Sequence, residues 1–394
     1  MKKEKPQHSS KSQYLCGKRI LPEPISKTTN IVQLVDSMDA YNGGRLRAAC
    51  HLLRDKYAPE DVTIGLSLAG ALTPAGLGPS TVVPLMNHGF VDWLTATGAN
   101  MYHDLHFAFN LPMHRGSHVV DDANLRKTGV TRIYDILFDY EDVLMETDRR
   151  LRQILLRPEF QKEMGTREFY YHLGKILDEH ERKNGIGQVS VLAAAYRNGI
   201  PVFTSSPGDS TIGMNVAGLE LLAEAAGVQD RFKLKINPSI DVNDSTAIIL
   251  NAKKYENGKT GVILIGGGSP KNFVLQTEPQ IQEVLMIPEA GQDYDINVTD
   301  ARPDTGGLSG APPSEAVSWG KIDPARLEET VTAYLDVTAA LPMMVAYTIQ
   351  TTRPKKLKRL YDRGYELHEK LMKSYLENNK EVEALKKLMK KLSA

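Results

Sequence analysis

The amino-acid sequence predicts an α/β fold, a doubly wound and mostly parallel sheet flanked by helices in a Rossmann-like arrangement. Two observations lead to this prediction. Short apolar runs rich in β-branched residues end in small residues and recur at positions 62–70, 90–100, 200–206 and 260–268. Segments with helical spacing lie between these runs, at positions 189–197, 213–226 and 246–254. Short buried strands that alternate with helices are typical of a parallel sheet covered on both faces.

The segments around this core follow from their composition. Residues 1–30 are polar and contain lysines, serines and three prolines, which predicts an N-terminal arm that is mobile or docked. Residues 31–350 are expected to form one main domain, with its first helices near 31–57 and outer helices in the charged interval 140–182. Residues 351–394 are lysine-rich, and we expect a charged, solvated helical tail because acidic residues interleave with the lysines.

The overall composition is that of a soluble globular protein, with 394 residues, 41% hydrophobic and 24% charged. The formal net charge is zero, so no global field recruits nucleic acid or an anionic membrane. Cys16 and Cys50 form no CxxC motif; one disulfide between them is possible, but reduced thiols are the simpler interpretation. The N-terminus lacks the apolar region of a secretory signal, and no apolar run is long enough to span a membrane. We therefore expect a cytoplasmic protein.

Glycine- and hydroxyl-rich turns follow the predicted strands, at positions 67–70, 95–98, 205–209, 266–268 and 297–299. In an open α/β sheet, ligands bind where the carboxyl ends of the strands meet such turns. Glycines let backbone amides approach a phosphate, and small hydroxyls add hydrogen-bond donors. None of the turns has the GxGxxG pattern, and each alone is better explained as a packing turn. Their joint occurrence after successive strands predicts a dinucleotide site.

The segment from Gly306 to Lys321 is the strongest candidate for catalysis. It joins a glycine-rich turn to Glu315, Trp319 and Lys321. A carboxylate pairs with an ammonium, and an indole face attracts a cation and shields its methylenes. A lysine beside an aromatic wall can lose its proton and act as a nucleophile. Composition alone would favour a surface turn that ends in a solvated lysine.

The run Ser314-Glu-Ala-Val-Ser-Trp-Gly-Lys321 resembles the active-site signature of the deoxyhypusine synthase family. The similarity covers roughly residues 25–350, with supporting blocks at 200–213, 261–272 and 294–299. The resemblance implies that Lys321 is the covalent nucleophile and that the cofactor is NAD. It also implies a homotetramer with active sites between paired subunits, in which the N-terminal arm could cover a neighbouring site.

Matched positions extend the resemblance to the ligands. The expected cofactor contacts are Ser67, Ala69, Gly70, Thr95, Gly98, Asp209, Gly267, Asn297 and Asp336. The expected substrate contacts are Glu315, Trp319, Asn272 and Ser309, to which we add His103 as a candidate. Asp209 could instead, or also, cap the helix that begins near residue 213.

The resemblance implies a transfer reaction without net oxidation. A polyamine such as spermidine would give a hydride to NAD and become an imine, and neutral Lys321 would take its aminobutyl group. An acceptor amine would then displace the lysine, and the retained NADH would reduce the new imine. The acceptor is a protein lysine in the family proper and a free diamine in related enzymes that make homospermidine. Lys321 must be neutral to attack, which requires desolvation or a nearby cation.

Three positions depart from the family pattern. Asn272 stands where a histidine, the proposed proton acceptor, is expected, and an asparagine cannot act as a general base near neutral pH. Met214 and Leu308 replace two expected carboxylates that help to hold the polyamine. Candidates that could compensate for the lost carboxylates are Asp300, Asp304, His103 and Asp104, and either His103 or His106 could replace the missing base. The spacing of the two histidines could suit a metal, but no third ligand is evident, and no metal site is predicted. Oxidative polyamine cleavage and a catalytically silent NAD-binding protein are the alternatives.

Overall fold

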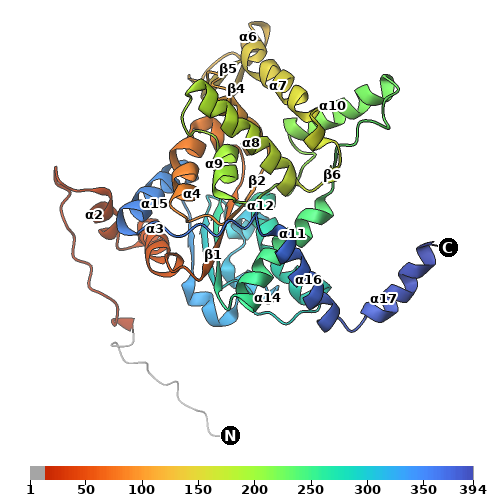
Figure 1. Cartoon of the computed structure of the whole chain (residues 1–394). Coiled ribbons are helices and arrows are strands. Elements are labelled where there is room, and N and C mark those ends of the chain that lie inside the picture. Colours follow the sequence, from red (N-terminus) through yellow and green to blue (C-terminus); the bar gives the residue numbers. More distant parts are fainter. Residues whose placement is uncertain (1–13, 394) are drawn as a thin grey trace.

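Six parallel strands form the central sheet of the protein, as seen in a computed structural model that describes residues 14–393. The strand order is β11-β10-β9-β1-β2-β7. The strands are β1 (Val62–Leu68), β2 (Trp93–Ala96), β7 (Val202–Phe203), β9 (Lys259–Ile265), β10 (Tyr294–Val298) and β11 (Thr330–Ala333). Helices cover both faces (Figure 1), which confirms the predicted doubly wound α/β fold. The strand order reverses between β1 and β9, so this is the topological switch point, where such sheets bind ligands.

One face of the sheet packs against helices from the first half of the chain and from α15. These helices are α2 (Ile31–Asp36), α3 (Tyr41–Leu52), α4 (Val83–Asn87), α5 (Gly98–Ala108), α8 (Thr166–Asn184), α9 (Val191–Asn198) and α15 (Val337–Thr351). They enclose the larger core, which includes Ile64 and Leu66 of β1 and Ile263 of β9. The predicted helices at 31–57 and 189–197 correspond to α2, α3 and α9.

The opposite face packs against α11 (Pro238–Leu250), α12 (Gly268–Leu275) and α13 (Thr277–Pro279), with α16 (Gly364–Asn378) outside α11. The indole of Trp93 lies over Gly65, where an added Cβ would be 2.7 Å from the ring. The same face carries a row of polar residues, because Ser67 pairs in register with Thr95 and Asn297 pairs with Thr332. This polar row lies one residue before the carboxyl ends of the strands, beside the start of α12.

A helical projection stands apart from the sheet (Figure 1). It contains α6 (Asp122–Lys127), α7 (Glu146–Leu155) and α10 (Thr211–Ala225). Its small sheets pair β3 (His114–Arg115), β4 (Val130–Ile133) and β5 (Ile136–Asp139), and separately β6 (Glu163–Met164) with β8 (Lys235–Ile236). The charged interval 140–182 forms α7 and α8, whose polar sides face outward while residues such as Leu151 and Phe169 are buried.

The two ends of the chain differ in how they pack. Residues 14–30 run along the outside with almost every side chain exposed (Figure 1). The segment after residue 350 differs from the expected solvated tail, because Lys355 is buried and its Nζ donates to the carbonyls of Tyr57 and Val62, at 2.8 and 3.1 Å. Burial lowers the pKa of Lys355 to about 8. Helix α16 packs on α11, and α17 (Val382–Met389) extends away from the body (Figure 1).

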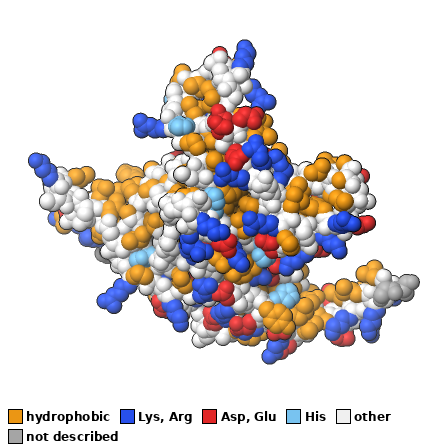
Figure 2. Space-filling view, turned by 45° about the horizontal axis from the view of Figure 1, so that its top comes forward, with side chains coloured by type: hydrophobic (Ala, Val, Ile, Leu, Met, Phe, Trp, Pro, Cys, Tyr) orange, Lys and Arg blue, Asp and Glu red, His pale blue; other side chains and the backbone are white. Residues whose placement is uncertain are grey.

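The surface carries both signs of charge. Figure 2 shows Lys and Arg side chains interspersed with Asp and Glu side chains over the face in view. Among the described helices, none is both long and apolar enough to cross a membrane.

Candidate active site

The glycine turn after β9 brings two parts of the site together. Gly266 and Gly267 have φ angles of +88° and +110°, in the region that favours glycine. A Cβ on Gly267 would lie 2.6 Å from Cα of Ser309, and one on Gly266 would lie 3.1 Å from Cβ of Ala69. The hydroxyl of Ser309 also accepts a hydrogen bond from the amide of Gly268, at 2.9 Å. The glycines therefore let the turns after β1 and β9 and the 306–311 loop meet at the switch point.

The residues expected to bind the cofactor lie along this same edge of the sheet. Ala69 and Gly70 follow β1, and Gly98 follows β2 and packs against Ser210. The hydroxyl of Thr97 donates to the carbonyl of Gly70, at 2.5 Å, and so joins the first two turns. The structure thus gathers the turns after β1, β2 and β9, with Asp209 after β7 and Asp336 after β11 at the two ends of the edge.

Buried polar atoms at this edge fit a polar ligand such as NAD. The hydroxyls of Ser67 and Thr95 and both amide atoms of Asn297 are buried and have no hydrogen-bond partner among the described residues. A buried polar group without a partner is costly, and a bound ligand or ordered water is the usual explanation. The residues present therefore suit a dinucleotide at the carboxyl edge.

The two aspartates expected at the cofactor have different local roles. Ser210, and not Asp209, is the cap of α10, because its hydroxyl accepts from the amide of Gly213 at 3.3 Å. Asp209 is exposed, so its carboxylate is accessible to a ligand. Asp336 caps α15 through bonds from the amides of residues 338 and 339, at 2.8 and 3.3 Å. A cofactor contact at Asp336 would share that carboxylate with the helix cap.

Lys321 lies in a cavity of about 410 Å³ next to the glycine turn. Helix α14 (Pro313–Ser318) begins at the second of two consecutive prolines and ends at a turn in which Gly320 has φ +65°. The turn is held by the amide of Lys321, which donates to Ala316 O at 3.0 Å, and by Gln282, whose Nε2 donates to Gly320 O at 2.7 Å. This geometry places Glu315, Trp319 and Lys321 along one cavity. The sequence predicts that these residues lie close together, but it does not predict how their side chains are oriented.

The amine of Lys321 is placed to act as a nucleophile. Its Nζ donates to Oδ1 of Asn272 at 3.2 Å and lies 5.8 Å from the centroid of the Trp319 ring. Burial lowers the pKa of Lys321 from its usual 10.5, and the charges of Glu315 and Glu283 offset this only in part. The net lowering increases the fraction of neutral amine, which is the reactive form. Trp319 is 60% exposed, so its ring forms a wall that an arriving substrate can cover.

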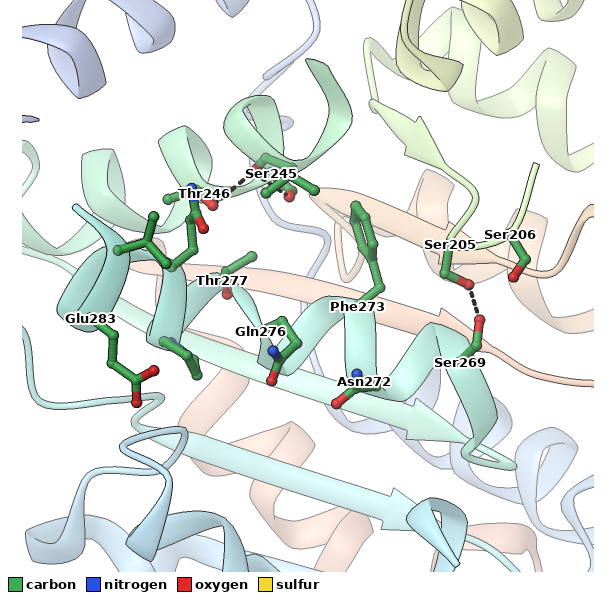
Figure 3. A pocket seen from close by; sticks show the side chains of 14 residues that line it. Ser205, Ser206, Ser245, Thr246, Ser269, Asn272, Phe273, Gln276, Thr277 and Glu283 are labelled. Carbon is green, nitrogen blue, oxygen red and sulfur yellow. Dashed lines mark hydrogen bonds between the residues drawn. The ribbon is translucent and has the colours of Figure 1, made fainter. Parts of the chain in front are cut away.

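Two further residues of this cavity were not anticipated. Lys271 is 4% exposed, and its Nζ donates to the carbonyls of Ser309 and Ala311, at 3.4 and 2.8 Å, which ties α12 to the 306–311 loop. Burial lowers the pKa of Lys271 as well. Gln276 lines the cavity one helical turn beyond Asn272 (Figure 3). The four-residue spacing from Asn272 is the signal in the sequence that could have found Gln276.

Other residues expected at the substrate lie elsewhere in the chain. His103 is in the projection-facing side of α5, where its Nδ1 lies 3.0 Å from Nε2 of His106 and its ring packs on Phe138. Burial lowers the pKa of His103 to about 4. Asp104 is buried and accepts from Ser190 and from two amides at the start of α9. The structure therefore does not bring this group to the Lys321 cavity of the same chain.

Asp300 and Asp304, which were expected to compensate for the missing carboxylates, do not line the Lys321 cavity. Asp304 is exposed and pairs with Arg302, and Asp300 is exposed. Ser309 joins the two loops and is not among the residues that line the cavity. Met214 and Leu308, which stand at the positions of the two missing carboxylates, are 66% and 40% exposed. Asn272 is thus the nearest uncharged partner of Lys321, and Glu315 is the carboxylate that lines its cavity.

Known proteins resemble this chain over most of its length. The sequence model of a family described as deoxyhypusine synthase matches residues 30–348. A deoxyhypusine synthase-like protein of Nostoc punctiforme is 51% identical over 361 residues, which are 91% of this chain and 90% of that protein. A deoxyhypusine synthase-like protein of Thermosynechococcus vestitus is 52% identical over 91% of this chain and 88% of that protein.

More distant relatives include a probable deoxyhypusine synthase 2 of Methanosarcina mazei, 34% identical over 84% of this chain and 90% of that protein. The crystal structure of a putative deoxyhypusine synthase from Entamoeba histolytica aligns with a TM-score of 0.51 and 14% identity. It covers 85% of this chain and 98% of that one. At 14% identity, this structural likeness supports the assignment of the fold and nothing further.

Proposed function

The chain belongs to the deoxyhypusine synthase family, and on this premise we propose that it is an NAD-dependent transferase of aminoalkyl groups. It would move an aminobutyl group from a polyamine such as spermidine to an amine acceptor through an imine on Lys321. The observation that carries the proposal is the half-buried Lys321, whose pKa is lowered and whose Nζ lies between Asn272 and the ring of Trp319. A lysine that only binds or supports a cofactor has no need of this environment.

The substrate would enter as a cation and meet groups suited to it. The carboxylate of Glu315 attracts an ammonium, and the exposed face of Trp319 covers the alkyl chain. Met214 and Leu308 stand where two carboxylates are expected, and neither carries a charge. Glu315 would therefore supply a larger share of the attraction for the ammonium than it would in a pocket with all three carboxylates. The polyamine pocket is therefore rebuilt, while the attacking amine is retained.

The cofactor would lie across the turns at the carboxyl edge. Gly70, Gly98 and Gly267 would give backbone access, and the buried hydroxyls of Ser67 and Thr95 would gain partners. Ala69, Asp209, Asn297 and Asp336 complete the proposed contacts. When bound, NAD would supply the oxidation of the donor amine and later the reduction of the transferred imine.

The residues of the chain handle the nitrogen chemistry. Neutral Lys321 would attack the substrate imine carbon and release the rest of the donor as an amine. Asn272 accepts a hydrogen bond from Lys321 and orients the nucleophile, but it cannot take up a proton near neutral pH. The amine that leaves is itself a base, so it can carry the proton that Lys321 loses. A dedicated histidine is then not required for this step.

We also propose that the protein forms a homotetramer with active sites between paired subunits. Exposed apolar side chains on α10, including Met214, Leu221 and Leu222, support contact with another copy. A protein lysine and a free amine both fit the Lys321 chemistry as acceptors. The N-terminal arm is mostly exposed along residues 14–30, and we propose that it contacts a neighbouring subunit.

Single-turnover formation of NADH tests the proposal. Wild-type protein loaded with NAD should reduce the cofactor when spermidine is added, followed by nicotinamide fluorescence. Lys321→Arg keeps the charge but cannot form the enzyme imine, so transfer should be lost while NAD binding is retained. Cofactor binding without any NADH formation across a series of di- and polyamines would instead favour the silent NAD-binding alternative.

A further inference from the structure

The helix α17 leaves the body of the protein with most of its surface uncovered. It projects to one side of the molecule beyond α16 (Figure 1), and a helical turn over Lys390–Ser393 (η11) continues it. Val382, the first residue of the helix, is 6% exposed, whereas every residue from 383 to 392 is exposed. The start of α17 is thus held at the body, and the rest of the helix reaches outward.

Hydrogen bonds fix the point at which the chain turns from α16 into α17. The amide of Asn379 donates to the carbonyl of Tyr375 at 3.0 Å, and its side-chain Oδ1 accepts from the amide of Glu381 at 2.8 Å. Asn379 is itself buried, and α16 is packed on α11. The chain therefore leaves the body at a defined residue.

One side of α17 and η11 carries a row of large apolar side chains. Leu385, Leu388, Met389 and Leu392 have the spacing i, i+3, i+4 and i+7, which places them on a single helix face. Their exposed fractions range from 39% for Leu385 to 86% for Leu392. Exposed apolar side chains gathered in one row are typical of an interaction site.

The other side of the same helix is positively charged. Lys386 and Lys390 are four residues apart, and so are Lys387 and Lys391, so their side chains form two rows along the helix. All four residues are exposed. Glu383 is the one carboxylate of the segment, and it pairs with Lys386 at 2.8 Å. Figure 2 shows Lys side chains beside hydrophobic ones on this projecting segment.

We propose that α17 and η11 form a helix that binds the surface of an anionic phospholipid membrane. The apolar row would enter the boundary between head groups and acyl chains, and the lysines would stay at the level of the phosphates. A lipid surface uses both sides of the helix at once, because it offers hydrocarbon beneath a layer of negative charge. The whole chain has no net charge, so the attraction is local to this helix.

Other partners would use only part of this surface. Two copies of α17 paired through their leucines would bring lysine rows together, and like charges at that distance repel. A nucleic acid would attract the lysines through its phosphates and would leave the apolar row in water. Because α17 projects from the body, it can lie flat on an extended surface without a matching groove (Figure 1).

Vesicle flotation with the full-length protein tests the proposal. The vesicles contain phosphatidylcholine alone or an equal mixture with phosphatidylglycerol. Each lysine at an anionic surface raises binding about fivefold, so four lysines against one glutamate should favour the anionic vesicles by about a hundredfold. Added salt should weaken this preference. No binding to the anionic vesicles, or equal binding to both kinds, would overturn the proposal.

Two double variants test the two sides of the helix separately. Lys387→Glu with Lys391→Glu should lower binding to anionic vesicles by more than about twentyfold, because two attractions become repulsions. Leu388→Gln with Leu392→Gln should lower it by about tenfold or more, because two apolar side chains no longer enter the lipid. Wild-type binding in either double variant would overturn the proposal.

Two controls distinguish lipid binding from a change in net charge and from contact between copies. Lys127→Glu with Lys175→Glu alters the net charge equally at exposed positions of α6 and α8, and it should bind within about twofold of wild type at physiological salt. Light scattering without lipid should give the leucine double variant the molar mass of wild type. A lower mass would show that the apolar row joins two copies of this chain, and would overturn the membrane proposal.

Discussion

Gly267→Ala probes the contact on which the assembly of the site depends. Gly267 has φ +110° and ψ −127°, a backbone region that is essentially restricted to glycine and costs other residues about 1–3 kcal/mol. The new Cβ would also lie 2.6 Å from Cα of Ser309, a backbone atom that cannot rotate away. Overpacking of this kind costs about 1–3 kcal/mol. We therefore expect the free energy of unfolding to fall by about 2–6 kcal/mol.

Urea unfolding followed by circular dichroism measures this change. The matched control is Gly218→Ala, at an exposed position inside α10 where an added Cβ meets nothing within 4 Å. That variant should gain up to about 1 kcal/mol, because alanine favours a helix over glycine. The Gly267→Ala protein should also trap less substrate on Lys321, since Ser309 belongs to the loop next to its cavity. A Gly267→Ala protein whose free energy of unfolding is within about 0.5 kcal/mol of wild type would show that the glycine is not required at this contact.

Three further changes follow from the charges and exposure of single residues. Labelling of Lys321 by an amine-reactive reagent should have its pH midpoint below 10.5. Glu315→Gln should lower that midpoint further, because the charge of Glu315 raises the pKa of Lys321. An upward shift of the midpoint in Glu315→Gln would contradict this prediction. Burial raises the pKa of Asp295 from 3.8 to about 7, so its contribution to stability is present below pH 4 and is lost as the pH rises through 7. In urea unfolding, the free energy of unfolding of Asp295→Asn minus that of wild type should therefore rise by about 2–3 kcal/mol from pH 5 to pH 8. A difference that does not change with pH would be evidence against a raised pKa of Asp295. Trp319→Ala should raise the KM for spermidine by about three- to tenfold, because the indole face attracts the cation. The free energy of unfolding should change by less than about 0.5 kcal/mol, because the ring is mostly exposed. An unchanged KM would show that Trp319 does not contact the substrate.

The sheet was predictable where its strands are continuous apolar runs. The runs at 62–70 and 260–268 became β1 and β9, the central pair. The strand β10 was indicated only by the expected turn at 297–299, because Asp295 and Asn297 interrupt its apolar pattern. The burial of Lys355 could not be predicted from the sequence either, because its partners are the backbone carbonyls of Tyr57 and Val62, almost three hundred residues earlier.

The candidate site was predictable where its residues are close in sequence. Glu315, Trp319 and Lys321 lie within one turn-and-helix segment, so their grouping is local. Lys271 reaches the cavity of Lys321 through the packing of α12, which no short pattern encodes. His103 follows the turn after β2, at the carboxyl edge of the sheet, but α5 leads it away into the layer around Phe138. Proximity in sequence to a ligand turn does not bring a helical residue to the ligand.

Covalent transfer through Lys321 leaves a mass change on the protein, which intact-protein mass spectrometry detects. The protein is incubated with NAD and spermidine, reduced with borohydride and compared with Lys321→Ala treated in the same way. We expect one aminobutyl-sized adduct per chain, located on Lys321 by peptide mapping and absent from the variant. An adduct of the same yield in Lys321→Ala, or none in wild type with any di- or polyamine, would contradict it.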